Sequence, residues 1–220
     1  MRTGRIGYGT VNDMQLVFVR HAQPQRVVTS TGIADPELTD IGWAQAARVP
    51  AALAHHRIAR VVSSPQRRAR ETAAPLAEKL GLTVEIVEGL AEYDLGLPLY
   101  LPIEQARDSD LNTQAAYERI KAGYLPESID ADAFGARVRA AVDEVIGAAD
   151  PADTVVAFAH GGVVNTTLQH LLNLELPLTF PIDYCSVTRI LQSRTGRRTV
   201  ATINENGHVW DLLPRNISQA

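Results

Sequence analysis

Three short apolar runs stand out along the chain, and each ends at a charged or glycine-rich turn. They are QLVFVR at 15–20, IARVVS at 58–63 and TVVAFA at 154–159. A continuous apolar run of about four to eight residues between turn residues is typical of a strand that is buried on both faces. The pattern therefore predicts three central strands of a sheet that is covered by helices.

Amphipathic segments alternate with these runs and predict the helices. The first helix is capped by Thr39 or Asp40, and Pro50 is expected to kink it or to end it. The second helix begins with Ser64 as its N-cap and Pro65 at its first helical position. Further elements follow from the same patterns, namely a strand at 83–87, helices at 131–149 and from 161 to about 172, and an edge hairpin with strands at 186–192 and 199–204.

Strands that alternate with helices predict an α/β fold, here a three-layer α/β/α sandwich with a mostly parallel central sheet. We expect a single domain at 14–214, preceded by a flexible, glycine-rich lead-in at 1–13. The segment at about 97–130 has a different texture, because the apolar LPLYLP at 97–102 is followed by polar helical stretches. We interpret it as a helical insertion over the functional site, and LPLYLP either roofs that site or packs on the core.

Composition limits the possible classes of function. The chain has 220 residues, 45% of them hydrophobic, and a formal net charge of −4, so its overall charge attracts neither nucleic acid nor an anionic membrane. No apolar run approaches the roughly 18 residues of a membrane span, and the N-terminal residues lack the apolar stretch of a signal peptide. A single cysteine excludes an internal disulfide. These features predict a cytoplasmic protein and leave its oligomeric state unspecified.

The three buried strands are each followed by residues that suit an anion. Arg20 and His21 follow the first strand, Arg68 lies on the helix after the second, and His160 and Gly161 follow the third. Because the carboxyl ends of parallel strands meet at one edge of a sheet, we expect these residues to converge on one crevice. Helix starts and guanidinium groups bind phosphoryl oxygens, and an imidazole is a nucleophile. The pattern predicts a phosphate site.

Six ordered segments carry a resemblance to a known family. They are VRHAQP at 19–24, LTDIGWAQA at 38–46, SSPQRRARETA at 63–73, LAEYDLG at 90–96, AHGGVV at 159–164 and CSVT at 185–188. In order and spacing they resemble the motifs of the histidine phosphatase superfamily, in its phosphoglycerate-mutase-like branch 1. The matches extend from about Gln15 to Thr188, so the resemblance covers most of the chain.

The resemblance implies a metal-independent hydrolase that acts on phosphoric monoesters. By that resemblance, His21 attacks phosphorus and becomes a phosphohistidine. Arg20, Arg68 and His160 hold the phosphoryl oxygens and stabilise the charge of the transition state. Glu92 protonates the leaving oxygen and then assists the attack of water on the phosphoenzyme.

The same resemblance extends the site to two further residues and describes its ligand. Gly161 and Gln23 are expected to contact the phosphate, no metal or other cofactor is implied, and the partner is a small phosphorylated substrate. The chain departs from the family at Pro24, where many members have Ser or Thr, and at Val27, where mutase-like members often have Asn. These departures, and the lack of the long mutase block after the acid segment, favour hydrolysis over phosphoglycerate mutation.

Three alternatives stay open at this point. A phosphoglycerate-mutase-type phosphotransferase uses the same residues, and a catalytically weak phospho-ligand-binding protein keeps the same pocket. His160-Gly161-Gly162 is also similar to an oxyanion-hole segment, but the Gly-x-Ser-x-Gly elbow of a serine esterase is missing from the sequence. Asp94 stands two residues after Glu92 and is the less suitable acid. The physiological substrate is not specified by these patterns.

Overall fold

The computed structural model of the chain describes residues 13–28, 32–97, 99–100 and 111–217. Apart from Asp13, the expected lead-in at 1–13 lies outside the described residues, as do 98 and 101–110 of the expected insertion. The part that is described accounts for every predicted strand and helix. In that part, no helix has both the length and the apolar character that a membrane crossing requires.

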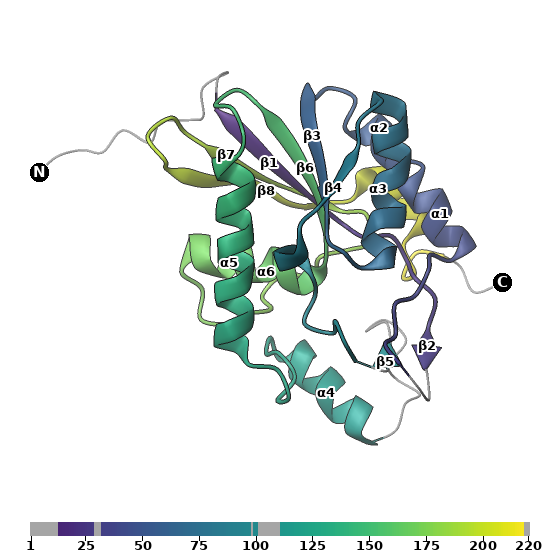
Figure 1. Cartoon of the computed structure of the whole chain (residues 1–220). Helices are drawn as coiled ribbons and strands as arrows, with labels where there is room; N and C mark the ends of the chain where they lie inside the picture. Colours follow the sequence, from purple (N-terminus) through teal and green to yellow (C-terminus); the bar gives the residue numbers. More distant parts are fainter. Residues whose placement is uncertain (1–12, 29–31, 98, 101–110, 218–220) are drawn as a thin grey trace, which may run out of the picture.

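A mixed sheet of six strands forms the centre of the molecule (Figure 1). The strands lie in the order β4-β3-β6-β1-β7-β8, of which the first four run parallel and the last two form the antiparallel edge hairpin that the sequence predicts. Their bounds are β1 Met14–Arg20, β3 Ile58–Ser63, β4 Val84–Ile86, β6 Thr154–Ala159, β7 Val187–Gln192 and β8 Arg198–Glu205. A separate pair, β2 (Val27–Val28) and β5 (Leu99–Tyr100), is antiparallel.

Burial follows the position of each strand in the sheet. Every residue of the central strand β6 is buried, whereas β8 at the edge shows only half-buried and exposed residues. Along β1, Leu16 and Phe18 contribute to the apolar core on one face, and Val17 and Val19 contribute to the core on the other. Because side chains alternate across a strand, a continuous apolar run is what a sheet covered on both faces requires.

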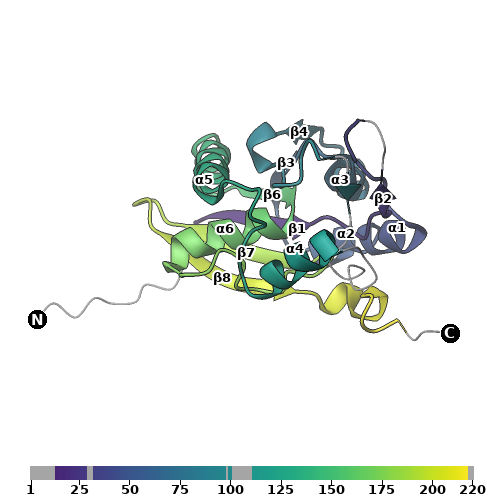
Figure 2. The same cartoon turned by 90° about the horizontal axis from the view of Figure 1, so that it is seen from below.

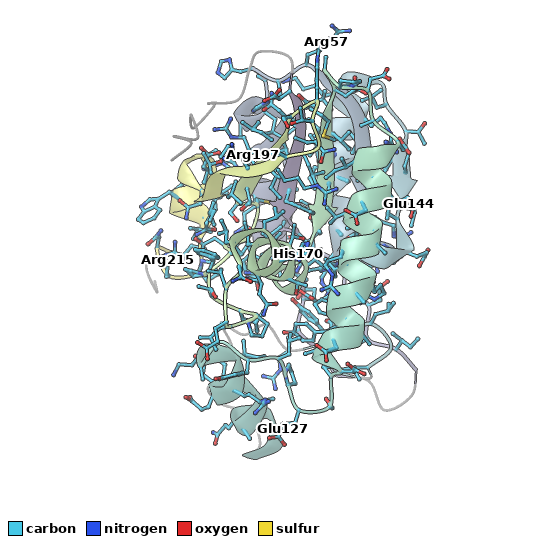
Figure 3. All side chains as sticks on the ribbon, turned by 90° about the vertical axis from the view of Figure 1, so that its left-hand side faces the viewer. Arg57, Glu127, Glu144, His170, Arg197 and Arg215 are labelled. Carbon is cyan, nitrogen blue, oxygen red and sulfur yellow. The ribbon has the colours of Figure 1, made fainter. Side chains whose placement is uncertain are left out.

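Helices cover both faces of the sheet, so the predicted three-layer sandwich is confirmed (Figures 1 and 2). One face carries α5 (Ala131–Gly147) and α6 (Gly161–Leu172), and the other carries α1 (Asp40–Ala46), α2 (Val49–Ala52) and α3 (Arg67–Leu80). The exposed Glu144 points away from the sheet on the outer face of α5 (Figure 3). Helix α4 (Leu111–Lys121) lies beyond the sheet, below α6, and two short 3-10 helices cover Glu88–Leu90 and Gly207–Leu212.

The first two predicted helices differ in detail from their predictions, one at its end and the other at its start. Thr39 caps α1 as expected, but that helix ends at Ala46, and Pro50 stands in the first turn of the separate helix α2, where its missing N–H costs nothing. The prediction that Ser64 caps the next helix is wrong. Helix α3 begins at Arg67 with Gln66 as its N-cap, so the prediction that Pro65 is its first helical residue is wrong as well. The chain makes a further turn after Ser64, in which the Ser64 hydroxyl accepts from the N–H of Gln66 over 3.3 Å and contacts the side chain of His160.

Candidate active site

The turn after β1 presents His21 with a defined tautomer. Its Nδ1 lies 2.8 Å from the carbonyl oxygen of Ala22, and only a protonated nitrogen can donate to a carbonyl. Nε2 therefore keeps its lone pair. The side chain is 2% exposed, yet it lines a cavity, and its ring centroid lies 5.1 Å from that of His160. His21 thus offers a neutral nucleophilic nitrogen.

Two other motifs hold the backbone of this turn. The N–H of Ala22 donates to Thr72 Oγ1 over 2.9 Å, and the N–H of Gln23 donates to Gln45 Oε1 over 2.8 Å. A Cβ atom on Gly42 would lie only 2.1 Å from the carbonyl oxygen of Gln23, so α1 approaches the turn as closely as a glycine allows. The LTDIGWAQA segment is therefore the support for the loop that follows His21.

Arg68 brings a buried guanidinium group to the cavity from α3. Its Nη2 donates to both carboxylate oxygens of Asp94 at 2.9 Å, and its Cζ lies 4.4 Å from the centroid of the Tyr100 ring. Nε and Nη1 find no acceptor among the described residues, although the side chain is 1% exposed. Buried donors without a partner are rare in proteins, so these two N–H groups are suited to an anionic ligand.

Arg20 enters the same cavity from the end of β1. Its Nη1 donates to the carbonyl oxygen of Ile182 over 2.6 Å, and its Cζ lies 4.1 Å from the centroid of the Tyr184 ring. These contacts hold the planar guanidinium group in one orientation. A fixed fork of N–H donors is the geometry that binds phosphoryl oxygens in a bidentate manner.

His160, at the end of β6, is fully buried behind His21. Its Nε2 lies 2.7 Å from Ser64 Oγ, and its Nδ1 has no partner in the described part of the chain. Burial and the charge of Arg68 hold the pKa of both His21 and His160 well below the usual value of a histidine. Without an anion, both imidazoles are therefore neutral at pH 7.

Glu92 supplies a carboxyl group that is 7% exposed and held at both oxygens. Oε2 accepts from the backbone N–H of Gly162 over 2.7 Å, and Oε1 accepts from that of Tyr93 over 3.1 Å. Burial, with the neighbouring charge of Asp94, raises the pKa of Glu92 to about 7. A carboxyl group with this pKa both gives and takes a proton near neutral pH.

The structure brings the predicted site residues together, but two of them do not line the cavity. Arg20, His21, Arg68, Glu92 and Gly161 line one cavity of about 600 Å³. His160 does not line it but lies next to His21, with the two rings tilted by 57°, and Gln23 belongs to the supporting loop rather than to the wall. The groups that the topology was expected to gather at one edge of the sheet do converge there.

Part of the LPLYLP segment also reaches this cavity. Leu97 and Tyr100 line it together with residues of α4, while 98, 101 and 102 lie outside the described residues. Among the residues that the structure describes, no group of three or more His, Cys, Asp or Glu side chains is arranged to hold a metal ion.

Several supporting residues are not apparent from the sequence patterns as functional. Gln66 donates to Asp94 through Nε2 and accepts from the N–H of Glu92 through Oε1, so it links the two acidic residues. Ser64 is the partner of His160, and Asp94 is the partner of Arg68. All three are polar residues inside the motif segments quoted above. Residues where a helix starts against a sheet are expected to be buried, and a buried polar side chain needs a partner, which is the signal that could have found them.

Comparisons with known proteins agree with this geometry. The model of the histidine phosphatase superfamily (branch 1) matches residues 16–206. The glucosyl-3-phosphoglycerate phosphatase of Mycobacterium tuberculosis is 33% identical over 172 residues, which cover 74% of this chain and 77% of that protein. A putative phosphoserine phosphatase 2 of Hydrogenobacter thermophilus is 27% identical, over 90% of this chain and 98% of the relative.

A solved structure gives the same result for the fold. The native structure of a mycobacterial glucosyl-3-phosphoglycerate phosphatase superposes with a TM-score of 0.69 at 27% identity, covering 87% of this chain and 98% of the other. Fold, site and relatives together define a phosphatase, an enzyme that hydrolyses phosphoric monoesters. More specifically, the chain belongs to branch 1 of the histidine phosphatase superfamily.

Proposed function

We propose that this enzyme hydrolyses small phosphomonoesters through a phosphohistidine on Nε2 of His21, with Glu92 as the general acid. One observation carries the proposal. The pKa of Glu92 is raised to about 7 while the pKa of His21 is held well below its usual value, and both groups line the same cavity. At pH 7 about half of the Glu92 carboxyl groups therefore carry a proton, and more do at lower pH, while His21 is neutral. A protonated acid beside a neutral nucleophile is the pairing that phosphoryl transfer to an imidazole requires.

In the first step, His21 Nε2 forms a bond to phosphorus as the bond from phosphorus to the ester oxygen breaks. The partnerless N–H groups of Arg68 and the guanidinium of Arg20 bind the nonbridging oxygens, where charge is spread in the transition state. Glu92 gives its proton to the leaving oxygen, so the product departs as an alcohol. The backbone N–H of Gly161, at the start of α6, adds a donor at a helix N-terminus.

His160 and Gln23 complete this proposal in lesser roles. A bound phosphate dianion brings negative charge next to His160 and favours its imidazolium form. This effect opposes burial and the charge of Arg68, which lower the pKa of His160. Protonated His160 then donates to a phosphoryl oxygen. A contact from Gln23 to the phosphate needs its side chain to turn toward the cavity that its loop borders.

In the second step, water replaces the histidine on phosphorus. The carboxylate left on Glu92 accepts a proton from the attacking water, the bond from Nε2 to phosphorus breaks, and inorganic phosphate leaves. Glu92 ends the cycle protonated and His21 ends it neutral. The positive charge that phosphoryl chemistry needs comes in this proposal from Arg20 and Arg68, so no metal ion takes part.

The relatives support a small phosphorylated metabolite as the substrate. Those named above are a glucosyl-3-phosphoglycerate phosphatase and a putative phosphoserine phosphatase. A cytoplasmic location is a prediction from the sequence alone.

The test is to trap the phosphoenzyme in the presence of a chelator. Wild-type protein and Glu92→Gln are mixed with ³²P-labelled p-nitrophenyl phosphate, whose leaving group needs little protonation, and quenched in alkali, which preserves phosphohistidine. We expect label on His21, more of it in Glu92→Gln because the attack of water is slowed, and none in His21→Ala. Glu88→Gln and His170→Ala, which alter exposed residues outside the cavity, are the matched controls and should behave as wild type.

Three outcomes would contradict the proposal. Turnover without label, label on another residue, or loss of activity in the chelator would each exclude a metal-independent phosphohistidine route. Product analysis separates the alternatives: an isomerised phosphoester instead of inorganic phosphate indicates a mutase. Tight phosphate binding without turnover indicates a phospho-ligand-binding protein.

A further inference from the structure

The cavity at the candidate active site is larger than a phosphoryl group needs. Its volume of about 600 Å³ lies in the range of pockets that enclose a small organic molecule. The charged groups described above gather at one end, near the carboxyl ends of β1 and β6. The other end reaches α4, which lies beyond the sheet in Figure 1 and closes this side of the cavity. The walls of this second end determine which leaving group fits.

Those walls are predominantly apolar. They come from three separate segments, namely the residues before and in β5, the helix α4, and the loop that follows α6. The principal apolar residues that line the second end are Leu97, Tyr117, Ile120 and Phe180. Tyr100 and Ile182 lie where the two ends meet, because the Tyr100 ring packs on Arg68 and the carbonyl oxygen of Ile182 accepts from Arg20. An apolar surface that is half-buried around a cavity gains free energy when a ligand removes it from water.

The side chains of Asn165 and Thr179, which also line the cavity, already form hydrogen bonds within the protein. Both amide hydrogens of Asn165 are engaged, by the carbonyl oxygens of Gly161 at 3.0 Å and Phe180 at 2.9 Å, and its Oδ1 accepts from the N–H of Phe180. Thr179 donates its hydroxyl hydrogen to the carbonyl oxygen of Leu176 over 2.9 Å. These residues shape the loop and leave few donors for a ligand.

Asp183, Arg215 and Lys121, the charged residues at this end, are likewise engaged. The Asp183 carboxylate accepts from Arg215, from Asn204 over 3.0 Å and from Asn206 over 2.7 Å. Lys121 donates to Glu118 over 3.3 Å on the surface of α4. A sugar or another polyol placed at this end would lose its hydrogen bonds to water and gain few in return, which is unfavourable for each hydroxyl.

We propose that the preferred substrates are phosphate monoesters of apolar alcohols, alkyl or aryl, rather than of sugars or other polyols. The inference rests on the proposed hydrolysis at His21, and it assigns the second end of the cavity as the site of the leaving group. The phosphoryl group lies against Arg20 and Arg68, and the apolar body of the alcohol lies between α4 and the 178–182 loop.

A homologous series of substrates tests this preference with the wild-type enzyme. Straight-chain alkyl phosphates from ethyl to hexyl have leaving groups of nearly equal basicity, so the chemical step stays constant along the series. We expect kcat/KM to rise about threefold for each added methylene that is buried. Propyl phosphate should exceed glycerol 1-phosphate about tenfold, because two hydroxyl groups are then desolvated without partners. A flat series, or a preference for glycerol 1-phosphate or glucosyl-3-phosphoglycerate, would overturn the inference.

A variant of the wall locates the effect. Ile120→Ser should flatten the dependence of kcat/KM on chain length, whereas Ile120→Leu should keep it. Ile120 is half-buried on α4, and far-ultraviolet circular dichroism checks that the helix persists in both variants. An unchanged dependence in folded Ile120→Ser would exclude α4 as the wall of the leaving-group site.

The outcomes separate this inference from the proposed function. If His21→Ala abolishes hydrolysis of every ester while the wild-type enzyme shows no dependence on chain length, the hydrolytic mechanism stands and the apolar preference fails. If His21→Ala retains hydrolysis with the same dependence on chain length, the cavity binds apolar esters but the nucleophile is wrong.

Discussion

The backbone N–H of Gly162 donates to the carboxyl group of Glu92 over 2.7 Å, and the contact leaves no room for a side chain at position 162. A Cβ atom there would lie 2.3 Å from Glu92 Oε1 and 3.0 Å from Oε2. The second glycine of the His-Gly-Gly turn therefore admits the proposed general acid to the cavity. The first glycine has no such neighbour, since its Cβ would meet only Arg20 Nε at 3.9 Å.

This relationship predicts that Gly162→Ala separates activity from stability. The carboxyl end of a flexible side chain can move away, and alanine is the better helix residue, so the free energy of unfolding should stay equal or rise by about 0.5 kcal/mol. Displaced Glu92 should lower kcat for alkyl phosphates about 10- to 100-fold. Gly147→Ala, where a Cβ meets nothing within 4 Å, is the control. Full activity in Gly162→Ala would show that the contact does not position the acid.

The raised pKa of Glu92 predicts the alkaline side of the pH profile. Its carboxyl group releases its proton at about pH 7 instead of near 4.5, so the acid form is present below pH 7 and is lost as the pH rises. We expect kcat/KM for ethyl phosphate, which reports the pKa of the free enzyme, to fall about tenfold per pH unit well above 7. Glu92→Gln should lack this descending limb. A profile that stays level to pH 9 in the wild-type enzyme would contradict the assignment.

The role of Glu92 also predicts a dependence on the leaving group. Protonation matters most when the departing oxygen is basic, so Glu92→Gln should slow alkyl phosphates by about 100-fold or more and p-nitrophenyl phosphate much less in the step that forms the phosphoenzyme. Burst-phase measurements isolate that step. Equal slowing for both substrates would count against Glu92 as the acid.

Asp94 is predicted to tune both neighbours. Its carboxylate pairs with Arg68 at 2.9 Å and is, after burial, the second cause of the raised pKa of Glu92. In Asp94→Asn the alkaline limb should therefore move down by about one pH unit. Arg68, whose charge is then less neutralised, should also bind phosphate severalfold more tightly. The pH dependence of the rate measures the first effect, and the inhibition constant of phosphate measures the second.

If the role of Asp94 is purely structural, folded Asp94→Asn protein should show neither the shifted alkaline limb nor the tighter inhibition by phosphate. Glu85→Gln breaks an exposed ion pair with Arg60 and serves as the control. It should leave the pH profile and the phosphate inhibition constant as in the wild type.

Gly42 is predicted to matter for stability. A Cβ atom there would lie 2.1 Å from the backbone carbonyl oxygen of Gln23, and a backbone atom cannot rotate away as a side chain can. Gly42→Ala should lower the free energy of unfolding by about 1–3 kcal/mol, measured by urea denaturation. Its loss of activity should follow from the shifted loop after His21. Unchanged stability would show that the helix and loop adjust freely.

Local patterns predicted the strands and helices well, for physical reasons that act over short distances. The apolar run at 154–159 specifies a strand buried on both faces, and Thr39 accepts the cap hydrogen bond that its type predicts. His21, Arg20 and Glu92 stand in motif segments whose spacing is visible in the sequence. Ser64 does not cap the helix, because the chain makes a further turn in which its hydroxyl group accepts from the N–H of Gln66 and contacts His160, 96 residues away.

By itself, then, the sequence determined the order of strands and helices, the end of the sheet at which the reactive groups gather, and the class of chemistry they suit. Only the tertiary structure decided which groups touch and what their proton affinities are. The pKa of Glu92 depends on its burial, on Asp94 and on the N–H of Gly162, and that N–H belongs to a residue 70 positions away. Such effects depend on the distance between groups in space and not on their separation along the chain. A pattern of residues that are neighbours in the sequence therefore does not predict them.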